Sequence, residues 1–551
     1  MGDVLIVVER SASDHPDMIG TIIKKDVRSF FDSLNLEPDQ IPENLRRPPV
    51  EIVANHGMAA TVSLTSIVLA TALQQADISF SIFDDDGIIA KYGERFLDEV
   101  RDAKVIAVST TYIIARKHIL NLLQVIHETA PGVPVILGGQ GIMALKLDPY
   151  SETDQGIFDL VDAVVYGDTE ENFTDIVRGF LSRSSDPEGP GVLRKIDGAW
   201  VGSSAPNAAD LEHAPIPDYG ILNRCKINGG TLPKDFRPGY AALEEGRGCN
   251  FKCRFCSYHV YSPFRRKSPE RMVAELRALK QQGFSNVSYV GAEFMAPLKA
   301  SKPVLEAIRD ADLGMGIWLY ARLDLIARNP EMFEILRSAG VTHLVFGMES
   351  GDENLLKAMK KYYDVNGMSV GAQQARDYGF EMMSSIIVGY PGEDESTIAA
   401  TIDVLNRCNF HTVFLHALNI LPDTPLWDLR DEFEIKISKS GYWTHKSMGL
   451  GQIPAAVKKI MMEVHENSDS VFINVIRDLA PSFVRPGADY SDEKLASVSK
   501  VLQDVLNEEW SQSDDYERKW KLWEKICAES TQLPNYVLEN VRREPEQAQS
   551  A

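Results

Sequence analysis

The sequence predicts an α/β protein with a doubly wound, Rossmann-like domain, then a partial barrel of six βα units, then a helical domain. Three observations lead to this class. Short runs rich in Val and Ile alternate with stretches of helical period, this alternation occurs in two successive parts of the chain, and the last residues, about one hundred of them, are rich in helical spacing. With 551 residues, the chain is also too long for one ordinary hydrophobic core, so two or three domains are expected.

The first predicted domain covers residues 1–182. Its five strands are Asp3–Glu9, Ser79–Asp85, Val105–Thr110, Val133–Gly139 and Ala163–Asp168. Helical period between them, as at Leu64–Gln75 and His118–Thr129, is typical of a doubly wound parallel sheet. Such sheets bind ligands in the turns that follow their strands. The segments Gly138–Gly141 and Tyr166–Asn172 are therefore candidate ligand loops.

Residues 183–235 are predicted to form a linker that contains one hairpin. The run RKIDGAWVGSS (194–204) holds the pair Asp197-Gly198, and an Asp-Gly pair favours a tight hairpin turn. The run LEHAPIPDYG (211–220) has the proline spacing of a linker on a surface.

Residues 236–430 are predicted to form a partial, TIM-type (β/α)6 barrel. Its strands are expected within 240–248 and at Asn286–Gly291, Gly314–Ala321, Thr342–Met348, Glu381–Gly389 and Thr412–Asn419. The active site of such a barrel lies at the carboxyl ends of the strands. Residues 431–551 are expected to form a helical cap, in which Trp510, Trp520 and Trp523 are core or interface residues.

Composition excludes several classes of protein. A net charge of −22 argues against a sequence-tolerant nucleic-acid binder, which needs a surplus of Lys and Arg. There is no stretch of 18 uncharged apolar residues, and the start of the chain, MGDVLIVVERSASD, lacks a basic region and a cleavage site. We therefore expect no membrane span and no secretory signal. Six cysteines in so long a chain indicate a reducing, cytoplasmic location rather than a disulfide scaffold.

Three of the six cysteines lie in one short loop. Cys249, Cys253 and Cys256 have the spacing Cys-x3-Cys-x2-Cys in the run GRGCNFKCRFCSYH (246–259). One interpretation is three buried thiols, and another is a zinc site with His259 as fourth ligand. Three thiolates on a loop that leaves the first barrel strand suit a four-iron cluster with one iron left open for a small molecule. The remaining cysteines, Cys225, Cys408 and Cys527, are expected to be ordinary small hydrophobic residues.

The cysteine loop, the six βα units and the preceding α/β domain together resemble cobalamin-dependent radical S-adenosylmethionine (SAM) enzymes, over roughly residues 1–450. The resemblance implies that Cys249, Cys253 and Cys256 hold a [4Fe–4S] cluster whose free iron binds SAM. It also implies a methyltransferase, in which SAM cleavage gives a 5′-deoxyadenosyl radical and methylcobalamin supplies the methyl group to carbon or, less often, phosphorus. A flavodoxin- or ferredoxin-type protein is the expected electron donor.

The substrate implied by the resemblance is a specialised-metabolite precursor, an amino acid such as tryptophan, or a peptide. Two alternatives stay open. Some relatives use cobalamin for ring contraction or cyclisation without methyl transfer, and a non-enzymatic iron–sulfur or corrinoid carrier is the other alternative. Formation of 5′-deoxyadenosine and of a methylated product distinguishes the three.

Five further residues match the SAM contacts of the family: Phe255, Glu293, Arg322, Glu349 and Ser350. By this likeness Phe255 lies near the adenine, Glu293 in GAEF (291–294) meets the methionine amino group, and Arg322 meets the methionine carboxylate, which suits a guanidinium fork. Glu349 and Ser350 resemble the ribose and sulfonium-side contacts. Helix capping by Ser350 and Asp352 is the alternative.

The first domain resembles the cobalamin-binding domain of the same family, with one departure. The motif Asp-x-His-x-x-Gly, whose histidine binds cobalt, has no match, because the run SDHPDMIG (13–20) has a different spacing. We therefore expect cobalamin without that ligand, with His56 or Met58 of the loop 55–63 near its lower face. The remaining expected contacts are Ser109, Thr110, Tyr112, Gly138, Gly139, Gln140, Gly167, Asp168 and Glu170.

Overall fold

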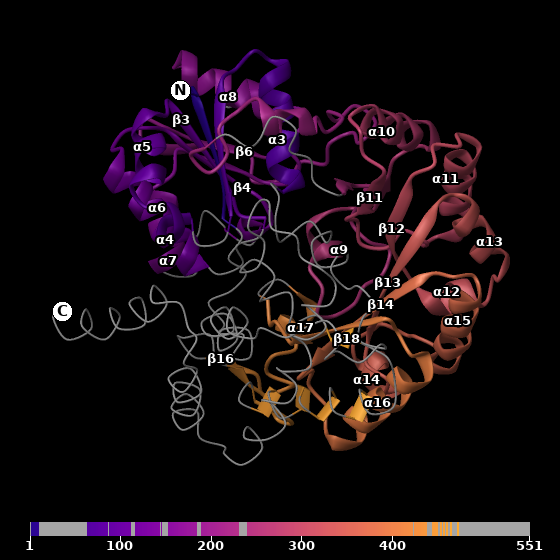
Figure 1. Cartoon of the computed structure of the whole chain (residues 1–551). Coiled ribbons are helices and arrows are strands. Elements are labelled where there is room, and N and C mark those ends of the chain that lie inside the picture. Colours follow the sequence, from indigo (N-terminus) through magenta and orange to yellow (C-terminus); the bar gives the residue numbers. More distant parts are fainter. Residues whose placement is uncertain are drawn as a thin grey trace, which may run out of the picture.

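The computed structural model describes residues 2–9, 63–85, 88–111, 116–143, 145, 152–183, 189–230, 240–421, 424–437 and 443–449, and scattered residues from 452 to 472. Figure 1 shows two α/β bodies in this part, one indigo to purple and one magenta to orange. Among the helices of the described ranges, none is both long and apolar enough to cross a bilayer. The predictions for the following residues lie outside the described ranges: His56, Met58, Tyr112, Trp510, Trp520, Trp523 and Cys527.

The first body is built on a seven-stranded sheet in the order β2-β1-β3-β4-β5-β6-β7. The strands are β1 (Val4–Glu9), β2 (Phe80–Asp85), β3 (Val105–Ser109), β4 (Val135–Gly138), β5 (Ala163–Val165), β6 (Val192–Ile196) and β7 (Ala199–Gly202). Strands β1 to β5 pair in parallel and coincide with the five predicted strands. The order reverses between β1 and β3, which is the switch point at which doubly wound sheets bind ligands.

Helices cover both faces of this sheet. They are α3 (Leu64–Gln75), α4 (Ile88–Tyr92), α5 (Glu94–Asp102), α6 (Arg116–Thr129), α7 (Glu152–Asp159) and α8 (Phe173–Ser182). On β1, Val4 and Ile6 belong to one apolar core with α3 and α8. Leu5 and Val7 belong to a second core with α5, α6 and α7. Because successive strand residues enter different cores, the helices lie on both faces, as a doubly wound sheet requires.

The predicted hairpin is confirmed as β6 and β7. Asp197 and Gly198 both have positive φ angles, 49° and 81°, which is the conformation of a type I′ hairpin turn. Strand β6 pairs antiparallel with β5. The hairpin therefore extends the first sheet.

The second body is built on a seven-stranded parallel sheet in the order β18-β15-β14-β13-β12-β11-β8. Its strands are β8 (Ala241–Leu243), β11 (Asn286–Tyr289), β12 (Gly316–Ala321), β13 (Val341–Glu349), β14 (Glu381–Val388), β15 (Thr412–Ala417) and β18 (Val471–Phe472). The first six lie within or overlap the six predicted barrel strands. The larger helices are α10 (Pro269–Gln281), α11 (Leu298–Asp310), α13 (Glu331–Ser338), α15 (Val365–Asp377) and α16 (Glu395–Cys408), with α12 (Leu323–Ala327) and α14 (Glu353–Ala358) between them. They form the outer layer of the curved sheet in Figure 1.

A short helix, η4 (Tyr219–Asn223), joins the two bodies. The Tyr219 hydroxyl donates to the Ala242 carbonyl at 3.0 Å and accepts from the Ala242 amide at 2.7 Å, so it is bound to β8. The preceding residue, Asp218, donates its amide to Thr71 of α3 at 3.0 Å. Tyr219 belongs to the apolar core that contains both α3 and the barrel strands. The two bodies therefore share one continuous core.

Candidate active site at the cysteine loop

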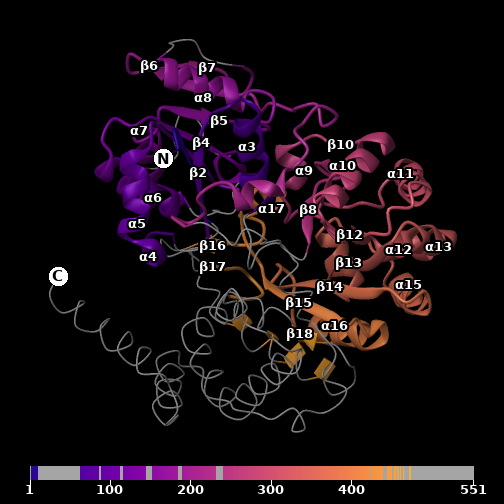
Figure 2. The ribbon, with the colours of Figure 1, turned by 45° about the horizontal axis from the view of Figure 1, so that its top comes forward.

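The three cysteines lie between two short strands, β9 (Gly246–Arg247) and β10 (Arg265–Arg266), that pair antiparallel. A short helix, α9 (Tyr258–Tyr261), follows the last cysteine. In both views α9 lies on the side of the second body that faces the first (Figure 1 and Figure 2). Gly248 begins the loop with a φ of 70°, and a β carbon there would lie 2.4 Å from the Ser262 carbonyl oxygen. Only glycine fits this position without a shift of the backbone.

The cysteine loop is held by backbone bonds to two other segments. The Arg254 amide donates to the Met359 carbonyl at 2.9 Å, and the Arg254 guanidinium donates to the Ala358 carbonyl at 2.9 Å. The Arg254 carbonyl accepts from the amide of Leu426, in α17 (Pro425–Asp428), at 2.8 Å. These bonds fix the middle of the loop against the end of α14 and against α17.

The three thiols are free in the structure. Burial raises the pKa of each, to about 11 for Cys256, and the nearby Lys361 ammonium opposes this rise. Metals bind the thiolate form of cysteine, and the positive charge of Lys361 favours that form. A four-iron cluster takes each thiolate on a different iron, which suits three thiols on one loop. The assignment of Cys249, Cys253 and Cys256 to a [4Fe–4S] cluster stays a prediction.

Glu349, at the end of β13, is paired with a lysine that the sequence did not single out. Lys361 Nζ lies 2.9 Å from Glu349 Oε1, and their side chains are only 12% and 9% exposed. Nζ also lies 5.9 Å from the centre of the Phe255 ring and 5.3 Å from that of Tyr363. Burial is the largest single influence and lowers the pKa of Lys361, but the acidic groups of Glu349, Tyr363 and Cys253 together raise it by more, so the pKa stays above its ordinary value. This lysine is therefore a charged group beside the cysteine loop.

Glu293 follows β11, is half-buried, and accepts from two backbone amides. Its Oε1 atom accepts from Met295 at 3.0 Å and from Arg322 at 3.1 Å. Burial raises the pKa of Glu293 to about 8, so the free protein holds this carboxyl largely protonated at neutral pH. An ammonium group placed beside it favours the carboxylate, because opposite charges stabilise one another.

The guanidinium of Arg322, at the end of β12, is bonded within the protein. Its Nε and Nη2 donate to the two oxygens of Asp324, each at 3.2 Å. Nη1 donates to the Lys361 carbonyl at 3.0 Å and Nη2 to the Tyr362 carbonyl at 3.3 Å. The rings of Phe251 and Tyr363 lie over it at 4.3 and 4.1 Å. In this structure the guanidinium of Arg322, which was predicted to bind the methionine carboxylate, binds the carboxylate of Asp324. Arg322 also holds the segment that carries Lys361.

Ser350 is fully buried and accepts from the Asp352 amide at 3.1 Å. Asp352 is the N-cap of α14, because its side chain accepts from the Leu355 amide at 2.7 Å. Helix capping in this segment, which was the alternative interpretation, is therefore present in the structure. A contact of Ser350 with SAM stays a prediction.

In the first body, the loops after β3 and β4 lie together at the carboxyl edge of the sheet. The Thr110 amide and hydroxyl both donate to the Gly138 carbonyl, at 2.7 and 2.8 Å. Gly139 has a φ of 98°, and a β carbon there would lie 2.6 Å from the Thr111 amide nitrogen. Gln140 then opens the short helix η3 (Gln140–Ile142), and Ser109 bonds the Thr111 hydroxyl at 3.0 Å. Ser109, Thr110, Gly138, Gly139 and Gln140, which were predicted to contact cobalamin, therefore lie together. The backbones of the two loops approach each other closely at Gly139.

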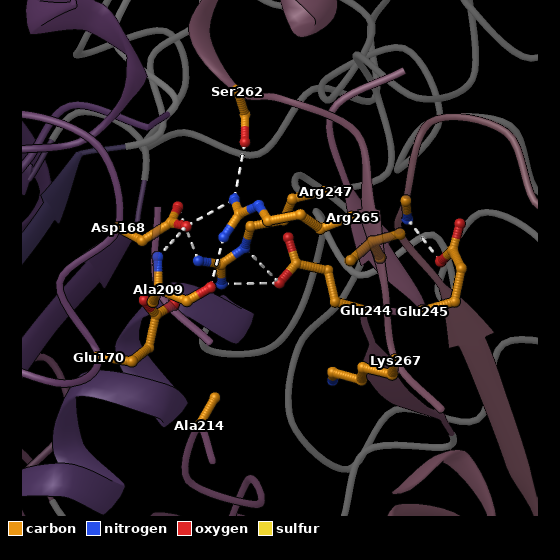
Figure 3. Close-up of polar contacts among 12 residues, drawn as sticks. Asp168, Glu170, Ala209, Ala214, Glu244, Glu245, Arg247, Ser262, Arg265 and Lys267 are labelled. Atoms are coloured by element: carbon orange, nitrogen blue, oxygen red, sulfur yellow. Dashed lines mark hydrogen bonds and ion pairs between the residues drawn. The ribbon is translucent and has the colours of Figure 1, made fainter. Parts of the chain in front are cut away.

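Asp168 and Glu170, in the loop after β5, have arginine partners from the strands that bracket the cysteine loop (Figure 3). Arg247 Nη1 lies 2.8 Å from Asp168 Oδ1, and Arg265 Nη2 lies 2.7 Å from Asp168 Oδ2. Arg247 also pairs with Glu170. The sequence marks Arg265 only as part of the basic run Arg265–Lys267 and gives no sign of either pairing. The predicted contact of these two acids with cobalamin stays untested, but their carboxylates are bound to the cysteine-loop strands.

Comparison with known proteins finds similar sequences for the second body. A family model described as the Radical SAM superfamily matches residues 244–405, which run from the start of the cysteine segment into α16. Among curated proteins, the chain is 26% identical over 227 residues to the hopanoid C-2 methylase of Rhodopseudomonas palustris (strain TIE-1), covering 40% of this chain and 41% of that protein. The chain spans about half the length of the curated relatives it matches.

Two solved structures share the fold over most of the chain. The radical SAM methyltransferase TsrM from Kitasatospora setae, with tryptophan substrate and the SAM analogue aza-SAM bound, has a TM-score of 0.59 at 13% identity, covering 91% of this chain and 99% of that chain. The cobalamin-dependent SAM radical enzyme OxsB, with aqua-cobalamin and SAM bound, has a TM-score of 0.56 at 12% identity, covering 100% and 82%. At these identities the likeness concerns the fold.

Proposed function

We propose that the protein, whose residues 244–405 match the family model described as the Radical SAM superfamily, is a cobalamin-dependent methyltransferase. It moves a methyl group from SAM, with cobalamin as carrier, to a carbon centre of a small organic substrate or a peptide. The observation that carries the proposal is the position of the cysteine loop. Its three thiols lie beside Lys361, and the strands that bracket it are bonded to Asp168 and Glu170 of the first body.

Cys249, Cys253 and Cys256 are the residues that hold the cluster in this proposal. When bound, the cluster supplies the electron that cleaves SAM, and cobalamin carries the methyl group. Lys361, Arg322 and Arg254 keep the loop and its charge environment fixed by the bonds described above. An external flavodoxin- or ferredoxin-type protein is the proposed source of electrons.

The methionine part of SAM has two charged groups, and the site offers a partner for each. The half-buried carboxyl of Glu293 suits the ammonium, because its proton is released when a cation is bound. Lys361 is the proposed partner of the carboxylate, since ammonium–carboxylate bonds are charge-assisted. Glu349, which accepts from Lys361, keeps that ammonium charged and oriented until SAM is bound.

Cobalamin is assigned to the first body, whose carboxyl edge gathers Ser109, Thr110, Gly138, Gly139 and Gln140. Gly139 allows the backbones of the loops after β3 and β4 to approach each other closely, which gathers these residues at one edge. The likeness of the fold to TsrM, a structure that contains tryptophan, supports an amino acid such as tryptophan, another specialised-metabolite precursor or a peptide as substrate.

The proposal is tested with anaerobically reconstituted protein, cobalamin, a strong reductant and SAM that carries a deuterated methyl group. We expect labelled methyl transfer to a substrate, with tryptophan as the first candidate and a library of amino acids and peptides next. Mass spectrometry measures the labelled product and 5′-deoxyadenosine.

Other outcomes assign the protein to another class. Formation of 5′-deoxyadenosine and an unmethylated product contradicts methyl transfer and indicates ring contraction or cyclisation. A protein that binds iron and cobalamin but never cleaves SAM is a carrier. The control is the variant in which Cys249, Cys253 and Cys256 are all replaced by Ala, which should produce no 5′-deoxyadenosine.

A further inference from the structure

Asp168 lies between two arginines and binds both (Figure 3). One carboxylate oxygen lies 2.8 Å from Arg247 Nη1 and the other lies 2.7 Å from Arg265 Nη2. The Asp168 side chain is 11% exposed, and those of Arg247 and Arg265 are 17% and 21% exposed. In such surroundings an ion pair is screened little by salt, and removal of one partner leaves an uncompensated charge.

The two arginines belong to the ribbon that carries the cysteine loop. Arg247 of β9 and Arg265 of β10 are direct partners in the antiparallel register. All three cysteines lie between these two strands. Two guanidinium groups on opposed residues repel one another, and Asp168 is the carboxylate that bridges them. The geometry of the ribbon therefore depends on a residue of the first body.

The backbone of Asp168 is fixed on the side of the first body. Gly167 has a φ of 84°, and a β carbon there would lie 2.2 Å from the Asn207 carbonyl oxygen. The Asp168 amide donates to the Asn207 carbonyl at 3.1 Å, and the Asn207 side chain donates to the Asp168 carbonyl at 3.0 Å. The Ala209 amide donates to Asp168 Oδ2 at 3.0 Å. Since Gly167 and Asp168 directly follow the buried Tyr166, the carboxylate moves with this edge of the first sheet.

Further charges complete the cluster. Glu170 and Glu244 both pair with Arg247, so three carboxylates surround two guanidiniums. Burial is the largest single influence and raises the pKa of Glu170, but Arg247 and backbone hydrogen bonds together lower it by more, so the pKa is below its ordinary value. Arg265 also donates to the Ala209 carbonyl and to Ser262 at 2.8 Å. Every guanidinium in the cluster is therefore directed toward the first body or along the ribbon.

We propose that Asp168 is a positioning residue that couples the ligand edge of the first body to the orientation of the cysteine loop. When a ligand orders the edge around Gly138 and Gly167, Asp168 is held in place. Its ion pairs with Arg247 and Arg265 then hold the ribbon in place as well. The coupling to cobalamin rests on the proposed function. Two reaction centres on separate bodies must be held in one geometry, because small misplacements slow group transfer strongly.

The first test is hydrogen–deuterium exchange of the full-length protein with and without cobalamin. In the parent we expect cobalamin to slow exchange both in 105–143 and in 244–266. Asp168→Asn keeps the shape of the side chain but removes its charge. In this variant cobalamin should still slow exchange in 105–143. In 244–266, exchange with cobalamin present should be about tenfold faster than in the parent, or more. Asp175→Asn is the matched control, because Asp175 pairs with Arg178 on the exposed surface of α8.

The second test separates coupling from simple loss of structure. Asp168→Asn should still load iron and form 5′-deoxyadenosine, but with a higher ratio of 5′-deoxyadenosine to methylated product. Adding Arg265→Gln removes one of the two opposed guanidiniums, and the double variant should recover part of the protection in 244–266. Recovery by a second loss of charge is expected of electrostatic bridging and not of general destabilisation.

The outcomes that overturn the inference differ from those that overturn the function. If Asp168→Asn retains the parent's protection in 244–266 and its product ratio, Asp168 does not couple the two bodies. The inference also fails if the double variant is worse than Asp168→Asn. If the parent shows no cobalamin effect in 105–143, the cobalamin assignment itself is wrong, and with it the coupling to cobalamin.

Discussion

Lys361 and Lys360 are neighbours in the sequence, but they lie in different surroundings. Lys360 is exposed, whereas Lys361 is 12% exposed and paired with Glu349. The side chain of Arg322 causes part of this difference, because it binds the carbonyls of Lys361 and Tyr362 and fixes the turn. Two adjacent lysines carry no signal of which one is buried, so the sequence does not indicate Lys361, and a contact of Arg322 with SAM stays a prediction.

Replacing Lys361 by Met should weaken binding of SAM to the reconstituted protein by about 1.5–3 kcal/mol, the usual effect of losing a charge-assisted bond. Anaerobic calorimetry with aza-SAM or SAM measures it. Lys360→Met is the matched control and should bind as the parent does. Equal affinity in the two variants contradicts the role of Lys361 and leaves the methionine carboxylate to another cation.

Glu393 gives a prediction about stability and pH. It is 2% exposed and accepts from the Gly389 amide at 2.5 Å. Burial raises its pKa to about 7, above the value of about 4.3 in an unfolded chain. Between these values the folded protein binds the proton more tightly than the unfolded chain does. The contribution of Glu393 to the free energy of unfolding should therefore fall as pH rises from about 4.3 to about 7.

Glu393→Gln removes this titration, so its stability relative to the parent should increase as pH rises through that window. Urea unfolding at several pH values measures the difference. The control is Glu395→Gln, at an exposed position in the same segment, which should follow the parent's dependence on pH. A constant difference between Glu393→Gln and the parent across the window contradicts the prediction.

At the scale of elements, the sequence predicts the helices, strands and turns that depend on residues close together in the chain. The runs around β1 and β13 are apolar and β-branched, and Asp197-Gly198 suits a turn with two positive φ angles, so strands and hairpin follow from local patterns. The cysteine spacing is local too. The bonds between Asp168 and Arg265 join residues far apart in the chain, and no local pattern contains such a pairing.

Substitution of the three cysteines in the cysteine loop should remove the iron and leave the cobalamin site in place. Replacing Cys249, Cys253 and Cys256 together by Ala should abolish the roughly four irons expected per reconstituted protein. Cobalamin binding should be largely retained, because that site is assigned to the first body. Iron analysis and absorption spectra measure both. Cys225→Ala is the control, since Cys225 lies outside the loop, and normal iron content in the triple variant would refute the cluster assignment.

At the scale of the whole molecule, the two bodies are joined by one apolar core and by η4. Tyr219 of η4 makes an apolar and a polar contact with the second body. Its ring centre lies 5.0 Å from that of Phe284, and its hydroxyl makes two hydrogen bonds to the backbone of Ala242. Domains with such a shared core should unfold as one unit, whereas domains joined by a small polar interface unfold separately.

Thermal unfolding of the parent, followed by exchange mass spectrometry in both bodies, should therefore show one midpoint. Tyr219→Ala should lower that midpoint and separate the transitions of the two bodies, because it creates a cavity at the junction. Tyr219→Phe keeps the ring and loses only the hydroxyl, so it should lower stability by about 1–3 kcal/mol without separating them. Two midpoints in the parent would show that the core is not shared in solution.

The position of η4 in the chain has a consequence for synthesis on the ribosome. Strands β1 to β5 and helix α8 leave the ribosome before residues 219–223 are made, and the barrel strands follow later still. Until then, the apolar side chains of α3 and α8 that later share a core with the barrel lack their partners. The nascent first body thus exposes an apolar face until the first barrel elements have been made. Expression of the full chain with slowed elongation, or with chaperones depleted, should increase the insoluble fraction.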